Sequence, residues 1–454
     1  MLIQTPLLAA TSPESPSLGL YPGLSWFWQV YFYAVLGLIL IGIINHIVLS
    51  VAALRMRHRG LPPAAPEDFL WVFFVPALDE EVTIADSVSR LAATDAPHKL
   101  IMVIDDGSED ATANILATLD VPDLQVLSRK APDARIGKAA ALNAAWRHLH
   151  GLLATPRYSR WRPEQVIVVV VDADGRLSAN APAEFSRHFA NPQMGGVQSL
   201  VRIYNRRSWL TWAQDLEFSA FGRLFQQGRA WWGTANMGGN GQANRLAALD
   251  DVATENGPWR NKLTEDQDIG VRLLHKGWLG SQDLVATVDQ QGVNSLRRLW
   301  RQRTRWAQGG WEATALAGTA HRIQAPWWAR IDALIYLFAP LVQLVILASF
   351  LSAIILAVTL ELPLWARTWP LILFFVSLSF LPGFIGLVAR GETLVEKLFA
   401  VILVIPYTLY AWIILPVVVR ALFRLVFGRT SWTKTAREPL NQQTEEESPA
   451  RGAN

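Results

Sequence analysis

Four stretches of the chain are apolar and carry no charged side chain over more than 20 positions. They cover residues 30–54, 333–360, 368–389 and 398–419. At 1.5 Å per helical residue, each stretch is long enough to cross a hydrocarbon core of about 30 Å. The pattern predicts one transmembrane helix at residues 26–54, and an interfacial helix with about three transmembrane helices at residues 325–428.

The residues that flank the first apolar run favour one orientation. Trp26 and Trp28 lie at its start, and Arg55 and Arg57 follow it. Aromatic side chains prefer the membrane interfaces, and basic side chains are retained on the cytoplasmic side. We therefore expect residues 1–25 to be extracytoplasmic and the chain after the helix to be cytoplasmic.

Two signals disagree about the C-terminal end. Three spans after a cytoplasmic domain place the polar tail, residues 429–454, outside, whereas the basic residues between positions 420 and 437 favour the cytoplasm. The conflict disappears if Trp327 and Trp328 begin an amphipathic interfacial helix that Pro340 separates from the next span.

Residues 66–310 alternate between strand-like and helix-like patterns. Apolar runs at residues 69–75, 100–104 and 166–171 each end in acidic residues, and helical patterns follow the first two. Strands that are apolar throughout are typical of a parallel sheet covered by helices on both faces. We expect a cytoplasmic α/β domain with a largely parallel sheet, inserted between transmembrane helices, that binds its ligand beyond the carboxyl ends of the strands.

Composition agrees with a membrane protein and excludes several classes of site. Of 454 residues, 51% are hydrophobic and only 17% are charged, well below the charged fraction of a soluble domain. The chain has no cysteine, which excludes disulfides, thiolate metal ligands and a cysteine nucleophile. A formal net charge of +3 is too small to indicate nucleic-acid binding.

Paired carboxylates follow two of the predicted strands. Asp172 and Asp174 come after the third apolar run, where two carboxylates can hold Mg²⁺ or Mn²⁺ against a diphosphate. Asp105 and Asp106 follow the second run. Taken alone, each pair also fits an ordinary turn, because aspartate followed by glycine is common in loops and aspartate often caps helices.

Two later segments add candidate chemistry. Asp266 begins a segment with helical periodicity, where a helix N-terminus would lower its pKa and keep it available as a base; a simple capping role is equally compatible. Gln302, Arg305 and Trp306 share one helix face and combine an amide, a phosphate partner and an aromatic platform. Arginines beside a membrane can also simply contact anionic lipids.

Residues 70–310 together resemble the membrane-bound family-2 glycosyltransferases, the processive synthases that make cellulose, chitin, hyaluronan and poly-N-acetylglucosamine. The resemblance depends on short motifs in a fixed order. These are Val-Pro-Ala-Leu-Asp-Glu at 75–80, Asp-Asp-Gly-Ser at 105–108, Gly-Lys through Leu-Asn at 137–143, Asp-Ala-Asp at 172–174, Thr-Glu-Asp at 264–266 and Gln-Arg-Thr-Arg-Trp at 302–306.

The resemblance implies a nucleotide-sugar-binding domain of the GT-A fold and a role for each matched residue. Asp266 is expected to be the catalytic base, and Asp172 and Asp174 to hold the metal. Nucleotide-sugar binding is expected at Pro76, Asp79, Glu80, Asp105, Asp106, Lys138 and Asp172, with Asp79 standing where the family more often has asparagine. Acceptor or product binding is expected at Glu265, Gly239, Asn240, Gln302, Arg305 and Trp306, although the Gly-Gly-Asn-Gly segment also fits a plain turn.

The expected function is an inverting glycosyltransferase of the cell membrane that transfers sugar from a UDP-sugar to a growing β-linked polysaccharide. An alternative is addition of one sugar to a lipid; the Gln302 to Trp306 segment favours the polymer-forming class. A transporter or receptor with a non-catalytic nucleotide domain is disfavoured, because the apolar runs contain no charged residue. The expected partners are the UDP-sugar, a polysaccharide or glycolipid acceptor and the bilayer, not nucleic acid, and the sequence identifies no export subunit.

Overall fold

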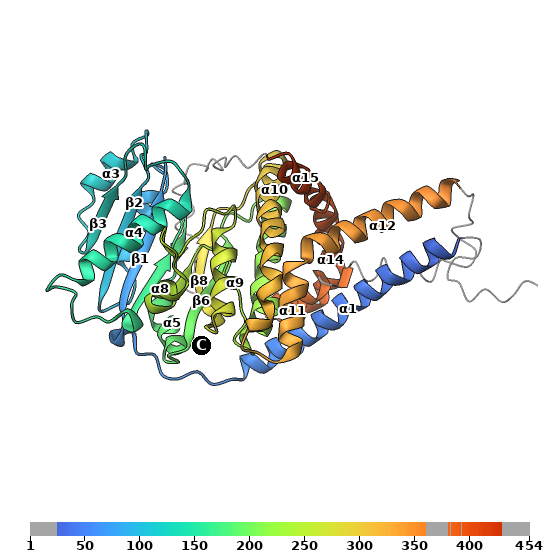
Figure 1. The fold of residues 1–454 in the computed structure, drawn as a ribbon, viewed down its shortest axis with the longest axis horizontal. Helices are drawn as coiled ribbons and strands as arrows, with labels where there is room; N and C mark the ends of the chain where they lie inside the picture. Colours follow the sequence, from blue (N-terminus) through green and yellow to red (C-terminus); the bar gives the residue numbers. More distant parts are fainter. Residues whose placement is uncertain (1–24, 360–379, 382, 392, 429–454) are drawn as a thin grey trace, which may run out of the picture.

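The computed structural model describes residues 25–359, 380–381, 383–391 and 393–428. The predicted tail at residues 429–454, nearly all of the N-terminal segment 1–25, and more than half of the predicted span at 368–389 lie outside these residues. In Figure 1, an α/β domain occupies one end of the molecule and long helices extend from the other.

One sheet of eight strands forms the centre of the α/β domain, in the order β3-β2-β1-β4-β7-β6-β8-β5. The strands are β1 (Leu70–Ala77), β2 (Lys99–Asp105), β3 (Leu124–Ser128), β4 (Val166–Val170), β5 (Arg176–Leu177), β6 (Met194–Ile203), β7 (Gln242–Arg245) and β8 (Leu279–Gln290).

The sheet is mixed, which corrects the expectation of a largely parallel one. Strands β3, β2, β1 and β4 are parallel, as are β6 and β8, but β7 is antiparallel to both of its neighbours and β5 is antiparallel to β8. β7 has only four residues and starts directly after the Gly238–Gly241 turn.

Helices cover both faces of the sheet, as the apolar strands predicted. α2 (Ile84–Ala92), α3 (Thr112–Thr118) and α5 (Ala181–Phe189) pack on the face that includes Trp71 and Phe73. α4 (Lys138–Leu153), α8 (Leu246–Val252) and α9 (Glu265–His275) pack on the face that includes Val72 and Phe74. Because successive side chains of β1 alternate between two buried faces, the strand has no polar face.

The remaining helical elements comprise the long helices, short turns of the α/β domain and the helices between these two parts. They are α1 (Trp26–Arg57), η1 (Pro66–Asp68), η2 (Pro163–Gln165), α6 (Trp209–Ala220), the π-helical η3 (Phe221–Gln226), α7 (Gln227–Ala230), α10 (Leu296–Ala313), η4 (Thr314–Arg322), α11 (Trp327–Leu337), α12 (Ala339–Thr359), α14 (Leu394–Ile414) and α15 (Val417–Val426).

Three helical stretches in the described part of the chain are long and apolar enough to cross a membrane. They are Trp26–Arg57, Ala339–Leu356 and Leu394–Val426. Only 11%, 6% and 22% of their most apolar windows are buried inside the protein. In Figure 1, α1 and α12 project away from the sheet.

The second half of α1 belongs to the folded domain. Leu49, Ala52 and Ala53 are buried, and α1 crosses α7 so closely that a Cβ on Gly228 would lie 2.4 Å from the Leu49 carbonyl oxygen. The Asn45 side chain donates a hydrogen bond to Asp332 of α11 at 2.9 Å. The exposed apolar surface of α1 is therefore greatest in its first half, where Trp26, Val30 and Ile41 lie.

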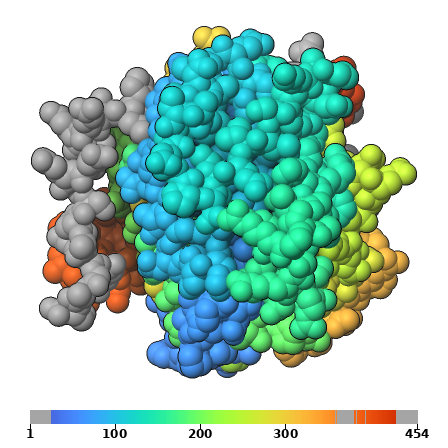
Figure 2. All heavy atoms as spheres, turned by 90° about the vertical axis from the view of Figure 1, so that its left-hand side faces the viewer, coloured from blue at the N-terminus to red at the C-terminus, as the bar shows by residue number. Residues whose placement is uncertain are grey.

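The chain returns to the α/β domain at α15, which packs against α10. Arg424 donates from Nε to Gln308 Oε1 at 3.0 Å, and the indole of Trp311 donates to the Val418 carbonyl at 3.2 Å. Residues just before position 429 therefore lie beside the domain. Figure 2 shows the opposite end of the molecule, where the visible surface is formed largely by the first half of the α/β domain.

Candidate active site

The carboxyl ends of β1 and β2 place the first predicted residues at one edge of the sheet. Pro76 pairs with Ile104, and Ala77 with Asp105, in the parallel register. Asp79 follows with φ of +53°, a left-handed conformation that Asn and Asp adopt more readily than other side chains. This preference accounts for an aspartate at a position where asparagine is commoner in the resembling family.

The turn after β2 is held by its own acidic side chains. Asp105 Oδ1 accepts the Ser108 backbone N–H at 3.0 Å, and Asp79 Oδ1 accepts the Glu109 N–H at 2.8 Å. The Glu80 N–H is donated to the Thr112 hydroxyl at 2.7 Å. These contacts fix the loop in which Asp106 lies.

Two arginines that the sequence did not single out complete this edge. Arg129 forms an ion pair with Asp106 in which both side chains are less than one-tenth exposed. Arg135 pairs with Asp79 at 3.1 Å and donates to the Gly107 carbonyl at 2.8 Å. Burial raises the pKa of Asp106, and Arg129 opposes that rise.

The sequence signal for these arginines was weak. Arg129 directly follows β3, a strand with alternating burial rather than an apolar run. The strand was therefore not predicted, and neither was the residue at its end.

A second group brings together three distant segments around Lys138. Its Nζ lies 2.6 Å from Asp172 Oδ1 and 3.6 Å from Glu265 Oε1. Lys138 starts α4, Asp172 follows β4, and Glu265 starts α9. Burial lowers the pKa of Lys138, but the surrounding carboxylates of Asp172 and Glu265 outweigh it, so the pKa is raised and the ammonium is retained.

Asp266 lies next to Glu265 in the first turn of α9. Its Oδ1 accepts the Gln267 N–H at 2.8 Å, and Gly239, with φ of +85°, approaches so closely that a Cβ there would lie 2.7 Å from Asp266 Oδ2. Burial raises the pKa of Asp266, while Lys138 and the Gln267 N–H oppose the rise. The prediction that the helix start lowers this pKa is therefore wrong, because burial outweighs it.

The Gly239–Asn240 turn joins the two carboxylates. Asn240 Oδ1 accepts the Asp172 backbone N–H at 3.1 Å, and its Nδ2 donates to Gln290 at 3.0 Å. Gln198 donates from Nε2 to the Asn240 carbonyl at 2.7 Å. The turn is therefore fixed between Asp172 on one side and Asp266 on the other.

The α10 motif lies close to the same cluster. α10 packs so closely on the residue before α9 that a Cβ on Gly309 would lie 2.2 Å from Thr264 Oγ1. The charge of Arg305 is near enough to oppose the burial-raised pKa values of Glu265 and Asp266. Gln302 and Trp306 are partly exposed on the same helix, and the Trp306 ring lies 6.0 Å from that of Phe218.

Asp172 and Asp174 suit a divalent cation bound together with a diphosphate. Asp174 is buried, and the Asp172 side chain is about one-third exposed. The ammonium of Lys138 already lies against Asp172, so the cluster accommodates positive charge. Among the described residues, no three acidic or histidine side chains form a metal-binding group. Mg²⁺ and Mn²⁺ typically take one or two protein carboxylates and complete their shell with substrate phosphates and water.

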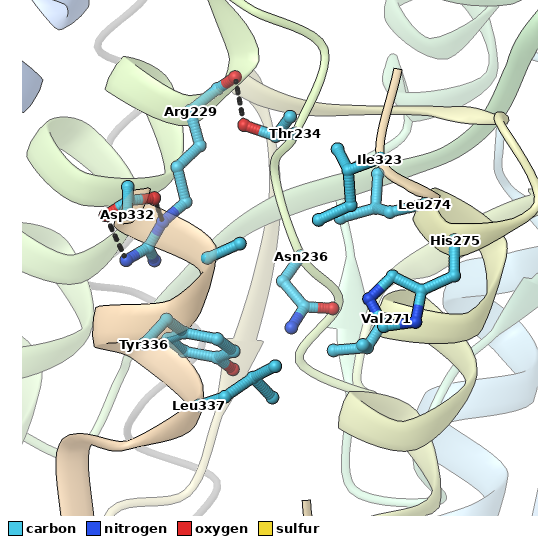
Figure 3. A pocket seen from close by; sticks show the side chains of 11 residues that line it. Arg229, Thr234, Asn236, Val271, Leu274, His275, Ile323, Asp332, Tyr336 and Leu337 are labelled. Carbon is cyan, nitrogen blue, oxygen red and sulfur yellow. Dashed lines mark hydrogen bonds and ion pairs between the residues drawn. The ribbon is translucent and has the colours of Figure 1, made fainter. Parts of the chain in front are cut away.

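A small cavity lies farther along α9, between α9, α11 and the loop after α7 (Figure 3). Its volume of about 20 Å³ holds about one water molecule, so it is no sugar site. Arg229 lines it and binds Asp332 at 2.7 and 3.1 Å. The Tyr336 hydroxyl hydrogen-bonds with Asn236 and Gln267, and burial raises the pKa of Tyr336 to about 12. The cavity therefore marks the junction of α9 with α11.

Comparison with known proteins identifies the α/β domain. Residues 69–309, more than half of the chain, match the model of the family described as "Glycosyltransferase like family 2". The chain is 32% identical over 284 residues to the beta-monoglucosyldiacylglycerol synthase of Synechocystis, covering 58% of this chain and 54% of that protein. It is 28% identical over 243 residues to the poly-beta-1,6-N-acetyl-D-glucosamine synthase of Staphylococcus epidermidis, covering 53% and 54%.

The chain thus spans about half the length of the curated relatives it matches. Among solved structures, the chain is similar to the mannosyltransferase PcManGT from Pyrobaculum calidifontis, solved in complex with GDP-Man and Mn²⁺. The TM-score is 0.55 and the sequence identity 16%, and the match covers 88% of this chain and 99% of that one. At that identity the likeness establishes the fold alone. The chain therefore belongs to glycosyltransferase family 2, and its α/β domain is a glycosyltransferase domain of the GT-A fold.

Proposed function

We propose that this enzyme is anchored in a membrane and transfers one sugar, with glucose the first candidate, from a UDP-sugar to a diacylglycerol-type lipid. The observation that carries the proposal is that few residues of the three apolar helices in the described part of the chain are buried inside the protein, so these helices do not enclose one another. A polymer-exporting enzyme needs a polar path for its hydrophilic product. The 32% identity to a glucolipid synthase supports the same acceptor class.

In the proposed reaction, the acceptor hydroxyl attacks the anomeric carbon and the nucleoside diphosphate leaves from the opposite face, which inverts the centre to a β-linkage. Asp266 is the candidate for the group that takes the hydroxyl proton. Its pKa, raised by burial, brings it closer to the working pH than that of an exposed aspartate, and this improves general-base catalysis. Glu265, Gly239 and Asn240 surround the position where the acceptor hydroxyl would lie.

The leaving diphosphate needs positive charge. Lys138 and Arg305 carry it on the two sides of the carboxylate cluster, where they would stabilise charge developing on the departing oxygens. Mg²⁺ or Mn²⁺ held by Asp172 and Asp174 would supply further neutralisation of the diphosphate. We assign Pro76, Asp79, Glu80, Asp105 and Asp106, at the far edge of the parallel strands, to the nucleoside.

The arrangement of helices suits an acceptor that arrives from a bilayer. Trp327 and Trp328 of α11 are 67% and 44% exposed, as expected for aromatic side chains at a membrane interface. α10 carries Trp306 and contacts α12 and α15. The proposed location is the cell membrane, with the GT-A domain on the cytoplasmic side, inserted between the transmembrane helices, and the end of α15 on that same side.

Processive polysaccharide synthesis is the second candidate. The Gln302 to Trp306 segment and the 28% identity to poly-N-acetylglucosamine synthases support it. In that case Trp306 would hold the end of the growing glycan.

Product analysis separates the two candidates. Purified enzyme is incubated with labelled UDP-glucose and Mg²⁺, with diacylglycerol in mixed micelles or with oligosaccharide primers, and the product is extracted and sized. We expect one organic-soluble glycolipid and release of UDP only when diacylglycerol is present. A high-molecular-mass, water-soluble product would overturn the lipid proposal. Asp266→Asn is the matched control, and it should bind UDP but form no product.

A further inference from the structure

Arg303 lies within the Gln302 to Trp306 segment. It is one of five arginines between residues 297 and 305. It differs from Arg301, which is exposed, because its own side chain is only 6% exposed. Leu299 is also buried and lies one helical turn earlier, so Arg303 is on the face of α10 that packs into the protein.

The buried guanidinium joins three helices. Its Nη2 donates to Glu217 of α6 at 2.6 Å and contacts the hydroxyl of Tyr410 of α14 at 3.3 Å. Tyr410 donates in turn to the same Glu217 oxygen at 2.7 Å. The three side chains form a closed polar cluster between the GT-A domain and an apolar helix that we propose spans the membrane.

The guanidinium also contacts the aromatic residue at the end of the motif. Its central carbon lies 4.2 Å from the centre of the Trp306 ring and 5.6 Å from that of Phe218. A planar guanidinium at 4.2 Å covers one face of the indole. The Phe218 ring meets Trp306 edge-on at 75°. Trp306 is therefore fixed from two sides and can offer only its remaining face to an acceptor.

We propose that Arg303 is a positioning residue that orients Trp306 for the acceptor, and that it makes this orientation depend on α14 through Glu217 and Tyr410. This inference relies on the proposed function only in taking Trp306 as part of the acceptor site. It holds for a lipid or a glycan acceptor, because it concerns the orientation of one ring. Binding of the UDP-sugar, at the other side of the carboxylate cluster, should not depend on Arg303.

The test separates positioning from simple stability. Arg303→Met removes both the charge and the stack, whereas Arg303→Lys keeps a cation for Glu217 but loses the planar stack on Trp306. We expect both variants to raise the acceptor KM about tenfold, the effect typical of losing a desolvated cation–π contact. The donor KM should stay unchanged. Only Arg303→Met should lower the melting temperature, and Arg301→Met is the matched control on the exposed face.

A double-mutant cycle with Trp306→Ala tests whether Arg303 acts through the ring. In the Trp306→Ala background, Arg303→Met should leave the acceptor KM nearly unchanged, since the group it orients is gone. The proposal is overturned if the effects of Arg303→Met and Trp306→Ala on the acceptor KM multiply, or if Arg303→Lys has the wild-type acceptor KM. It is also overturned if all kinetic parameters worsen together with the melting temperature. All assays use the acceptor on which the wild-type enzyme is active, so a polymer product would refute the lipid proposal and still decide this one.

Discussion

Replacing Gly239 by alanine tests whether Asp266 is the base without changing any ionisable group. The added Cβ would lie 2.7 Å from Asp266 Oδ2, about 0.7 Å closer than the 3.4 Å at which ordinary contact begins. The carboxylate cannot turn away freely, because its other oxygen accepts the Gln267 N–H at 2.8 Å. Gly239 also has φ of +85°, where a side chain adds roughly 1–2 kcal/mol of backbone strain.

A displacement approaching 1 Å at a reacting group typically lowers turnover by about 100-fold. We expect Gly239→Ala to show a loss of kcat of that order, measured as UDP release at saturating donor and acceptor. UDP affinity, measured by titration calorimetry, should change little because the residues proposed to bind the nucleoside do not include Gly239. Gly238→Ala is the matched control, since its Cβ would lie 3.7 Å from Gln198 and the residue has no positive φ. Wild-type turnover in Gly239→Ala would refute the assignment of Asp266.

Three further predictions follow from the carboxylate cluster and the buried ion pair. Lys138→Met removes a cation that opposes the burial-raised pKa of Asp266, so this pKa rises further. The acid limb of the pH profile of kcat should therefore move to higher pH; if it does not move, Asp266 is not the base. Chelation by EDTA should stop turnover, and Mg²⁺ or Mn²⁺ should restore it; full activity in EDTA would exclude the metal role of Asp172 and Asp174. Arg129→Met leaves Asp106 buried without its partner and should lower the free energy of unfolding by roughly 3–5 kcal/mol. Adding Asp106→Asn to this variant should restore part of that free energy, as measured by denaturant unfolding.

The sequence predicted the parallel half of the fold because β1, β2 and β4 are apolar throughout. Such strands produce a strong local signal, and the parallel sheet rule then places their acidic ends together. β3 alternates in burial, and β7 has four residues of which three are polar. Neither has a local pattern that distinguishes it from a loop, so the mixed character of the sheet could not be predicted.

The same reasoning explains what was found and missed at the site. Lys138, Asp172 and Glu265 occur in short motifs of a known order, and the structure brings Lys138 within 4 Å of each of the two carboxylates. Arg129 occurs in no motif, and Arg303 lies in the 302–306 motif but was assigned no role, because the importance of both depends on burial and on partners from other segments. The direction of the Asp266 pKa was mispredicted for a related reason, since a sequence shows the helix start but not the burial.

α1 has 32 residues and is about 48 Å long at 1.5 Å per residue, which exceeds a hydrocarbon thickness of about 30 Å. The excess corresponds to the half that crosses Gly228 and donates from Asn45 to Asp332. Counting apolar residues therefore overstates how much of this helix is free of contacts with the rest of the protein. A foreign helix of equal length and hydropathy would lack the side chains that pack on α7 and bind Asp332, so α1 cannot be replaced without disturbing the fold that it helps to form.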